Sequence, residues 1–178
     1  AKIEGSGMSA AAIAAWLQRP SPGTGTTFPL TGEGKIALAS ALMAQGRTAD
    51  AQPIIRDAWR TARVETTLQA ATLQRFGSML TPQDHAARVD MLLWADRRAQ
   101  ARALTDLLSP RDRDIALHRL GLAGGQSEIL DSELQRQPGV LYERVKRLRQ
   151  GNSRAEALQL LQQIDSRGLP ETALDPLY

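Results

Sequence analysis

The chain has 178 residues, of which 42% are hydrophobic and 23% are charged, and its formal net charge is +3 at pH 7. This composition is typical of a folded protein rather than a disordered tail, and no apolar run approaches the roughly 18 residues that a membrane span needs. The absence of cysteine excludes disulfides, thiolate catalysis and cysteine-ligated zinc, and the small net charge does not predict a nucleic-acid-binding protein.

The N-terminal part of the chain divides into three segments. Residues 1–7, AKIEGSG, are typical of a vector-derived scar before Met8, and we leave them out of the fold prediction. Residues 8–18 are rich in alanine and predict a short helix. Residues 19–32 contain three prolines and three glycines, which predict a connecting loop. We therefore expect a short helix plus linker over 8–32 and a helical superhelix over 33–178.

From residue 33 onward the pattern is helix, turn, helix. Apolar residues recur at helical spacing, and no segment shows the alternation of a half-buried strand. The predicted helices cover 33–45, 48–62, 65–76, a segment beginning at Pro82, 97–108, a segment beginning at Pro110, 128–136, a segment beginning at Pro138, and 154–164. Together with the first helix, they predict an all-α protein.

Local signals place several of these helix starts. Thr81-Pro82 and Ser109-Pro110 each supply an N-cap hydroxyl followed by proline at the first helical position. Thr48 is the expected N-cap of the helix over 48–62. The residues expected to face inward are Ile36, Leu38, Ala39, Leu42, Met43, Ile54, Ile55, Ala58, Trp59, Leu68, Ala71, Phe76, Val89, Leu92, Leu93, Ile115, Leu117, Leu120, Leu122, Leu141, Val145, Leu148, Ala157, Leu158, Leu161 and Ile164.

Three similar turn segments occur in the sequence. They read GRTADA at 46–51, DRRAQA at 96–101 and GNSRAEA at 151–157. Each copy follows a helix-length apolar segment and opens the next helix with two alanines, whose small side chains allow close backbone approach. Links this short force antiparallel neighbours. The copies lie 50 and 56 residues apart, unlike tetratricopeptide repeats of about 34 residues. We therefore expect an irregular α-solenoid of antiparallel, tetratricopeptide-like hairpins; a compact helical bundle is the alternative.

The sequence shows no catalytic constellation. His85 and His118 are the only histidines, and they form no HExxH pair. No glycine-rich phosphate loop ends in Lys-Ser or Lys-Thr, and no G-x-S-x-G turn is present. We expect no metal and no cofactor, and we interpret both histidines as structural.

Acidic and aromatic residues are likewise interpreted as structural. Two acidic groups, one of Asp112 and Asp114 and one of Glu128, Asp131 and Glu133, are expected to cap helices and to interact with helix dipoles. The three tryptophans, Trp16, Trp59 and Trp94, are expected to pack in the core, and stacking of exposed rings on sugars is the alternative.

A basic cluster is the most pronounced charge feature. The segment ERVKRLRQGNSR holds five cations at a helix end and in the turn after it, namely Arg144, Lys146, Arg147, Arg149 and Arg154. Cations near a helix C-terminus interact favourably with its dipole, which explains several of them without a ligand. The alternative is a binding surface for an anionic partner or a glycan.

Three blocks in a fixed order resemble the superhelical, non-catalytic region of soluble lytic murein transglycosylases. They read GEGKIALASALMAQGRTADAQPIIRDAWR, LQRFGSMLTPQDHAARVDMLLWADRRAQARAL and QPGVLYERVKRLRQGNSRAEALQLL, and the resemblance spans about residues 33–163. The middle block is the most specific of the three.

The resemblance implies an α-solenoid that carries a separate lysozyme-like domain toward the C-terminus of a periplasmic carbon–oxygen lyase. Such enzymes cleave the MurNAc–GlcNAc bond of peptidoglycan to a 1,6-anhydro product, using a glutamate in a Glu-Ser motif. This chain has no Glu-Ser dipeptide, so no catalytic residue is carried over and the chain alone is expected to be inactive.

The implied role is a scaffold that positions the catalytic domain of the same polypeptide and contacts peptidoglycan or cell-wall proteins. We expect no nucleic-acid partner. The alternative function is a stand-alone helical-repeat module that binds a protein or peptide in a concave groove.

Overall fold

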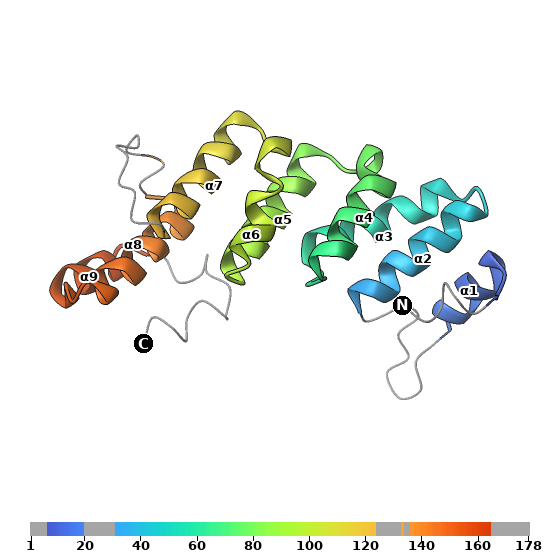
Figure 1. The fold of residues 1–178 in the computed structure, drawn as a ribbon, viewed down its shortest axis with the longest axis horizontal. Helices are drawn as coiled ribbons and strands as arrows, with labels where there is room; N and C mark the ends of the chain where they lie inside the picture. The colour runs from blue at the N-terminus through green and yellow to red at the C-terminus, as the bar shows by residue number, and fades with distance from the viewer. Residues whose placement is uncertain (1–6, 20–30, 124–132, 134–135, 165–178) are drawn as a thin grey trace. The chain divides into compact units, whose positions relative to one another are not determined.

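Residues 7–19, 31–123, 133 and 136–164 are the part of the chain that the structure, a computed structural model, describes. In this part all regular structure is helical, with no strand, so the all-α prediction is confirmed (Figure 1). The elements are α1 (Ala10–Leu17), α2 (Gly32–Ala44), α3 (Thr48–Thr61), α4 (Thr66–Phe76), the 3₁₀-helix η1 (Gly77–Met79), α5 (Pro82–Trp94), α6 (Arg98–Arg102), the 3₁₀-helix η2 (Thr105–Leu107), α7 (Pro110–Ala123), α8 (Pro138–Gln150) and α9 (Arg154–Leu161).

Some predictions lie outside the described residues. These are the connecting loop, apart from its two ends, and most of the helix predicted over 128–136. In the part that is described, no helix is both long and apolar enough to cross a membrane. The chain divides into two compact units, residues 1–88 and 89–178, and each is described by itself.

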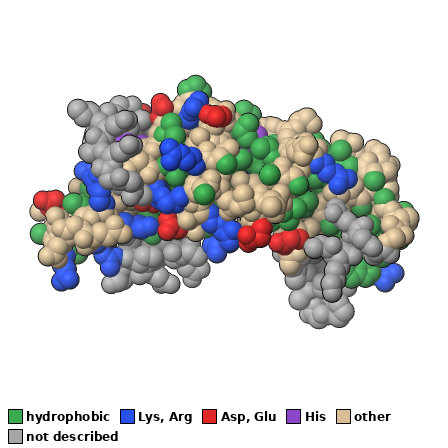
Figure 2. Space-filling model, viewed as in Figure 1, with side chains coloured by type: hydrophobic (Ala, Val, Ile, Leu, Met, Phe, Trp, Pro, Cys, Tyr) green, Lys and Arg blue, Asp and Glu red, His purple; other side chains and the backbone are tan. Residues whose placement is uncertain are grey.

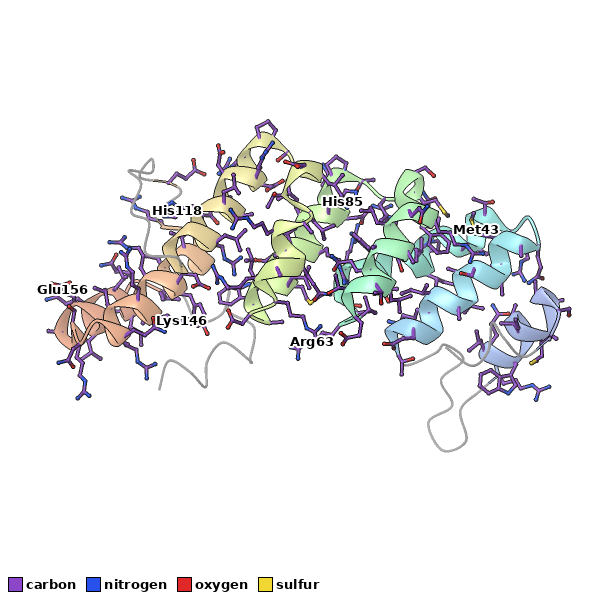
Figure 3. The ribbon with its side chains drawn as sticks, viewed as in Figure 1. Met43, Arg63, His85, His118, Lys146 and Glu156 are labelled. Carbon is purple, nitrogen blue, oxygen red and sulfur yellow. The ribbon has the colours of Figure 1, made fainter. Side chains whose placement is uncertain are left out.

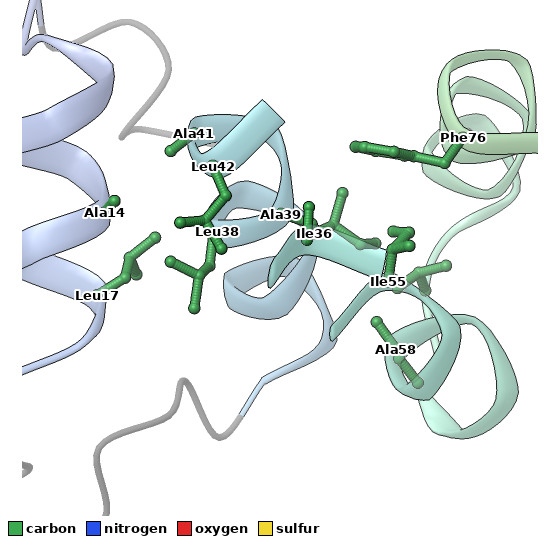
Figure 4. Close-up of a cluster of buried hydrophobic side chains, with 13 residues drawn as sticks. Ala14, Leu17, Ile36, Leu38, Ala39, Ala41, Leu42, Ile55, Ala58 and Phe76 are labelled. Atoms are coloured by element: carbon green, nitrogen blue, oxygen red, sulfur yellow. The ribbon is translucent and has the colours of Figure 1, made fainter. Parts of the chain in front are cut away.

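The core of the first unit forms around α2. This helix is apolar on nearly all sides, and it packs against α1 on one side and α3 on the other. Figure 4 shows the resulting cluster, in which Leu38 and Leu42 of α2 lie between α1 and the side chains of α3. The prediction that this helix is buried between neighbours is therefore confirmed.

Helix α4 contributes Phe76 to the same core, as predicted. Ala71, however, is exposed, and the other buried residues of α4 are the polar Gln69 and Thr72. The prediction was wrong at this position because α4 turns a polar face inward, where Gln69 meets a buried arginine.

The second unit has a core formed by α8 and α9 together with the end of α5. Its buried residues are Leu141, Tyr142, Val145, Ala157 and Leu160, and Trp94 packs against them. Two predictions differ from the structure. Leu158, expected inside, is 64% exposed because Leu160 takes the inward position. Leu117 of α7 is also exposed.

The helix predicted over 97–108 is in fact two short pieces, α6 and η2. The threonine at the start of η2 bonds its hydroxyl to the carbonyl of Arg102 at 2.9 Å. Such a local side-chain bond competes with a continuous helix, and Leu104 is still buried at the break.

Two helix starts follow the predicted capping chemistry. The Thr81 hydroxyl accepts a hydrogen bond from the Asp84 backbone N–H at 3.3 Å, and the Ser109 hydroxyl accepts one from that of Asp112 at 3.2 Å. The prediction of Thr48 as an N-cap was wrong. Arg47 holds that position and makes no side-chain cap bond, because the preceding turn already fixes the backbone there.

The three similar turn segments have the same backbone geometry. A residue with left-handed backbone follows the first helix, and its N–H and that of the next residue bond back to two carbonyls of that helix, as in a Schellman motif. The left-handed residues are Gly46 (φ 74°), Asp96 (φ 54°) and Asn152 (φ 64°). The longer-reaching bonds are Arg47 N to Leu42 O (3.0 Å), Arg97 N to Leu92 O (2.8 Å) and Ser153 N to Leu148 O (2.9 Å).

The second alanine of each copy becomes part of the core. Ala51, Ala101 and Ala157 are all buried, whereas the first alanine of each pair is exposed. Each buried alanine lies nine residues after the leucine whose carbonyl closes the turn. The three segments are therefore one structural unit used three times.

Replacing Gly46 tests how much the left-handed residue contributes. A Cβ added there meets no atom within 4 Å, so Gly46→Ala should lower the free energy of unfolding through backbone strain alone, by about 1–2 kcal/mol. Gly151→Ala is the matched control, because Gly151 precedes the left-handed residue of its turn and has φ −80°. Urea unfolding followed by circular dichroism measures both; equal losses would contradict the assignment.

Candidate functional site

Two buried arginines, one in each unit, lie on the rings of tryptophans. The Cζ of Arg88 is 4.8 Å from the ring centroid of Trp59, and that of Arg119 is 4.7 Å from that of Trp94. The two arginines are only 0% and 3% exposed. The ring face attracts the cation. The Trp59 cluster comprises Trp59, Gln69, Asp84, His85 and Arg88; the Trp94 cluster comprises Asp90, Trp94, Arg119, Gly139 and Tyr142.

Every face of the Arg88 guanidinium has a partner. Its Nη1 donates to the carbonyl oxygens of Trp59 at 2.9 Å and Ala62 at 2.8 Å. Its Nε and Nη2 both donate to Oε1 of Gln69, at 3.1 and 2.8 Å. The two carbonyls lie at the C-terminal end of α3, which is the negative end of the helix dipole. Arg88 therefore caps the C-terminal end of α3. The protein acceptors replace the water molecules that the guanidinium gives up on burial.

Asp84 is completely buried and is held by four donors. It accepts hydrogen bonds from the Thr81 N–H (2.8 Å) and hydroxyl (2.9 Å), from Arg56 (2.9 Å) and from Arg60 (2.5 Å). Burial acts to raise the pKa of Asp84, but these hydrogen bonds outweigh it and hold the pKa below its ordinary value of 3.8. The carboxylate is thus a charged structural anchor rather than a proton donor.

His85, labelled in Figure 3, follows Asp84 on α5. Its ring lies edge-on to the ring of Trp59, with centroids 5.8 Å apart. Its Nδ1 and the indole Nε1 of Trp59 are both buried without a hydrogen-bond partner. Burial lowers the pKa of His85 below 6.5, and the charge of Asp84 offsets this only in part. The imidazole is therefore neutral near pH 7 and is not oriented by an acid, as a catalytic histidine would be.

The Trp94 cluster repeats the arginine–tryptophan contact with different neighbours. The Tyr142 ring packs against Trp94 with centroids 5.0 Å apart, and Arg119 Nη1 donates to Asp90 at 2.6 Å. Burial raises the pKa of Tyr142, and the charges of Glu143 and Asp96 raise it further. The phenol therefore stays protonated at neutral pH.

Arg98 connects three parts of the second unit. Its Nη2 donates to the carbonyls of Arg119 (2.9 Å) and Leu120 (3.0 Å) in α7, while its Nη1 lies 3.5 Å from the buried carboxylate of Glu143 in α8. Both buried acids, Asp84 and Glu143, are thus held by arginines. In the described part of the chain, moreover, no three His, Asp or Glu residues come together in a way that could hold a metal ion.

The structure divides the five residues of the predicted basic cluster. Lys146 is half-buried, lies 3.9 Å from Asp96 and packs over the Tyr142 ring. Arg144 and Arg147 are half-buried on α8, whereas Arg149 and Arg154 are exposed. The five are therefore not equivalent, and Lys146 belongs with the Trp94 cluster.

Three arginines of the basic cluster lie on α8 and α9 without an acidic partner among the described residues. Within the described residues, Arg144, Arg147 and Arg154 form no ion pair, whereas Arg98, Arg111, Arg113 and Arg119 each pair with an acid. Figure 2 shows Lys and Arg side chains gathered over the C-terminal helices on the face in view. These three, which we call the unpaired arginines, form the candidate anion-binding surface; the use of this surface stays a prediction.

The other predicted groups take mostly structural positions. Asp112 accepts the Ser109 hydroxyl at 2.7 Å, and Glu133 pairs with Arg111. Trp59 is buried, as predicted for core packing, but Trp16 is 52% exposed. His118 is half-buried. Asp114 is exposed, and Glu128 and Asp131 lie outside the described residues.

Sequence reasoning did not find Arg88, Arg119 or their partners Gln69 and Asp90. A signal was present for the first. His85, Arg88, Val89 and Leu92 recur at the spacing of one helical face, so a charged residue stands inside an apolar stripe. Buried arginines are rare unless they are paired, and this position should have indicated a long-range partner.

Comparison with known proteins identifies no relative: no family model, no curated protein and no solved structure matches this chain. Its function is therefore inferred from its own residues.

Acid should destabilise the first unit through His85. A histidine whose pKa is lowered on folding contributes stability above its unfolded pKa of about 6.5, and this stability is lost as pH falls below that value. Asp84, also with a lowered pKa, adds a loss that begins below pH 3.8. The free energy of urea unfolding should thus fall from pH 7 to pH 5. His85→Phe should reduce this dependence of the unfolding free energy on pH, and His118→Gln should not. An unchanged dependence in His85→Phe would contradict the role given to His85.

Arg88→Lys tests whether the guanidinium fork stabilises the Trp59 cluster. Lysine keeps the charge but cannot bond Gln69 through two nitrogens while it reaches two carbonyls. We expect a loss of about 2 kcal/mol in unfolding free energy. Arg63→Lys is the control, because Arg63 is exposed (Figure 3). A loss in Arg88→Lys no larger than in the control would show that only the charge matters.

Proposed function

We propose that this chain is the non-catalytic superhelical scaffold of a periplasmic peptidoglycan lytic transglycosylase. The observation that carries the proposal is the turn used three times, with matching hydrogen bonds and a buried alanine nine residues after the closing leucine. A hairpin formed by such a turn buries only part of its apolar surface and needs a stacked neighbour. In this proposal the hairpins stack into an irregular solenoid, and the resemblance in sequence supplies the enzyme class.

The state of the buried acids supports a scaffold role. Among the described residues, Asp84 and Glu143 are the acids most enclosed by the fold, and both face arginines. A glycosidic general acid needs a raised pKa, whereas the pKa of Asp84 is lowered. Chemistry on the glycan is thus assigned to a lysozyme-like domain, and this chain positions it.

The unpaired arginines support contact with an anionic polymer. Arg144 and Arg147 lie one turn apart on α8, and Arg154 begins α9 after the turn. Peptidoglycan carries carboxylates on its stem peptides, so these cations would hold the wall near the catalytic domain. The alternative, a stand-alone interaction module, shares the repeated hairpins but requires no affinity for the cell wall.

Binding to purified sacculi tests the proposal. The chain should co-sediment with sacculi, and the triple variant with Arg144, Arg147 and Arg154 changed to glutamine should be retained several-fold less. A triple change of Arg47, Arg111 and Arg113 to glutamine removes the same charge from ion-paired surface sites and should have little effect.

Digestion of the same sacculi provides the second measurement. The chain alone should release no 1,6-anhydromuropeptide, whereas fusion to a lysozyme-like transglycosylase domain should release more than that domain alone. Release by the unfused chain would overturn the scaffold assignment, and retention unaffected by either triple substitution would remove the role of the unpaired arginines.

A further inference from the structure

The residue nine positions after the left-handed residue shows how the first two repeated hairpins are covered. In both of them this residue is buried: Ile55 is 0% exposed and Thr105 is 6% exposed. Ile55 belongs to the same hydrophobic cluster as Phe76 at the end of α4 (Figure 4). The 3₁₀-helix η2, which begins at Thr105, packs against α7. In each case the next helix along the chain packs beside this position.

Among the described residues, the third hairpin lacks such a cover. Leu161, nine positions after Asn152, is only half-buried. Leu158, six positions after the same residue, is 64% exposed. The first two hairpins have polar residues at that position, Gln52 and Arg102, which are also exposed. Leu158 and Leu161 are three residues apart on α9, so they are neighbours on its surface, and we call this pair the α9 leucine face.

The segment that follows α9 has a sequence suited to cover this face. It reads DSRGLPETALDPLY over residues 165–178, which lie outside the described residues. Pro170 can begin a helix, as Pro110 does for α7 and Pro138 does for α8. Leu174 would come about one turn later. The segment thus combines the start signal of the helix that covers the second hairpin with an apolar side chain.

The link before Pro170 is long enough for the chain to return along α9. Residues 165–169 span at most about 17 Å when extended, whereas the eight residues of α9 are only about 12 Å long. Gly168 favours a chain reversal within this link, because glycine adopts left-handed backbone without a steric penalty. An attached segment also has an effective concentration of about 1 mM or more near its site, which favours it over a second copy of the chain.

We propose that residues 169–178 dock on the α9 leucine face, with Leu174 against Leu158. They cover the third hairpin as α4 and α7 cover the first two, and removal of apolar surface from water drives the contact. The inference goes beyond the proposed function, because it depends on the repeated hairpin and on no affinity for peptidoglycan.

Disulfide formation in the full chain tests this contact, because the sequence has no cysteine of its own. Leu158→Cys combined with Leu174→Cys should oxidise several-fold faster than Gln159→Cys combined with Leu174→Cys. Gln159 is exposed and adjacent in sequence, but it lies about 100° further around the helix. Peptide mass mapping identifies the bond, and non-reducing electrophoresis distinguishes a bond within one chain from a bond between two chains.

Three outcomes of the oxidation decide the proposal. Faster oxidation within one chain in the variant that carries Leu158→Cys supports it. Equal rates for the two cysteine pairs would show that the segment does not dock on this face. Disulfide-linked dimers whose yield rises with protein concentration would assign the face to a second copy of the chain and would overturn the proposal as well.

Amide hydrogen exchange provides a second measurement that leaves α9 unchanged. Leu174→Asp should speed exchange in α9 several-fold, because the segment would no longer cover the helix. Thr172→Asp is the matched control, since it adds the same charge to the same segment without removing an apolar side chain. Equal exchange rates of α9 in the two variants would contradict the docking of Leu174.

Discussion

The left-handed residue that closes each helical hairpin is the constraint on which the rest of this chain depends. At Gly46, Asp96 and Asn152 the chain reverses within two residues, and the carbonyls of the helix just ended accept the next two N–H groups. The reversal brings two helices together, and the alanines Ala51 and Ala157 are buried near the start of the second helix. Once the hairpin exists, its remaining apolar face determines what must pack against it.

Buried arginines pack beside two of the few aromatic residues of this chain. Phe, Trp and Tyr together form 4% of the sequence, and the two most enclosed tryptophans are each covered by a buried guanidinium. Arginine fills the volume of a large side chain and also binds carbonyls at helix ends, as Arg88 does for α3 and Arg98 does for α7. Its desolvation is costly unless its N–H groups find acceptors, and Arg119 departs from this because its buried Nε and Nη2 have none.

Features that depend on neighbouring residues were predicted in part, since Thr48 is not an N-cap. The caps at Thr81 and Ser109 follow from local backbone chemistry, and the structure confirms them. The left-handed residue of the third turn is harder to predict. It is Asn152 rather than the preceding Gly151, because asparagine also tolerates this conformation. The repeat of the turn, rather than its glycine, was the reliable signal.

Features that depend on distant residues could not be predicted in the same way. Arg88 bonds Gln69, 19 residues away, and carbonyls 26 and 29 residues away. No local pattern specifies these partners, although an arginine inside an apolar stripe could have indicated that partners exist. The basic cluster shows the opposite error. Its five cations look equivalent in sequence, but the ring of Tyr142 and the carboxylate of Asp96 remove Lys146 from it.

The distribution of charge also limits how the unpaired arginines can act. Residues 89–178 contain thirteen Lys and Arg and thirteen Asp and Glu, so the second unit has no net charge with which to attract a distant polymer. Attraction at the end of α8 is therefore confined to about one Debye length, roughly 8 Å at physiological salt. A surface of this kind holds a polymer that is already near and releases it when salt rises. Such weak, local binding is compatible with the proposed scaffold role, because tight capture would slow the movement of a polymer to a separate catalytic domain.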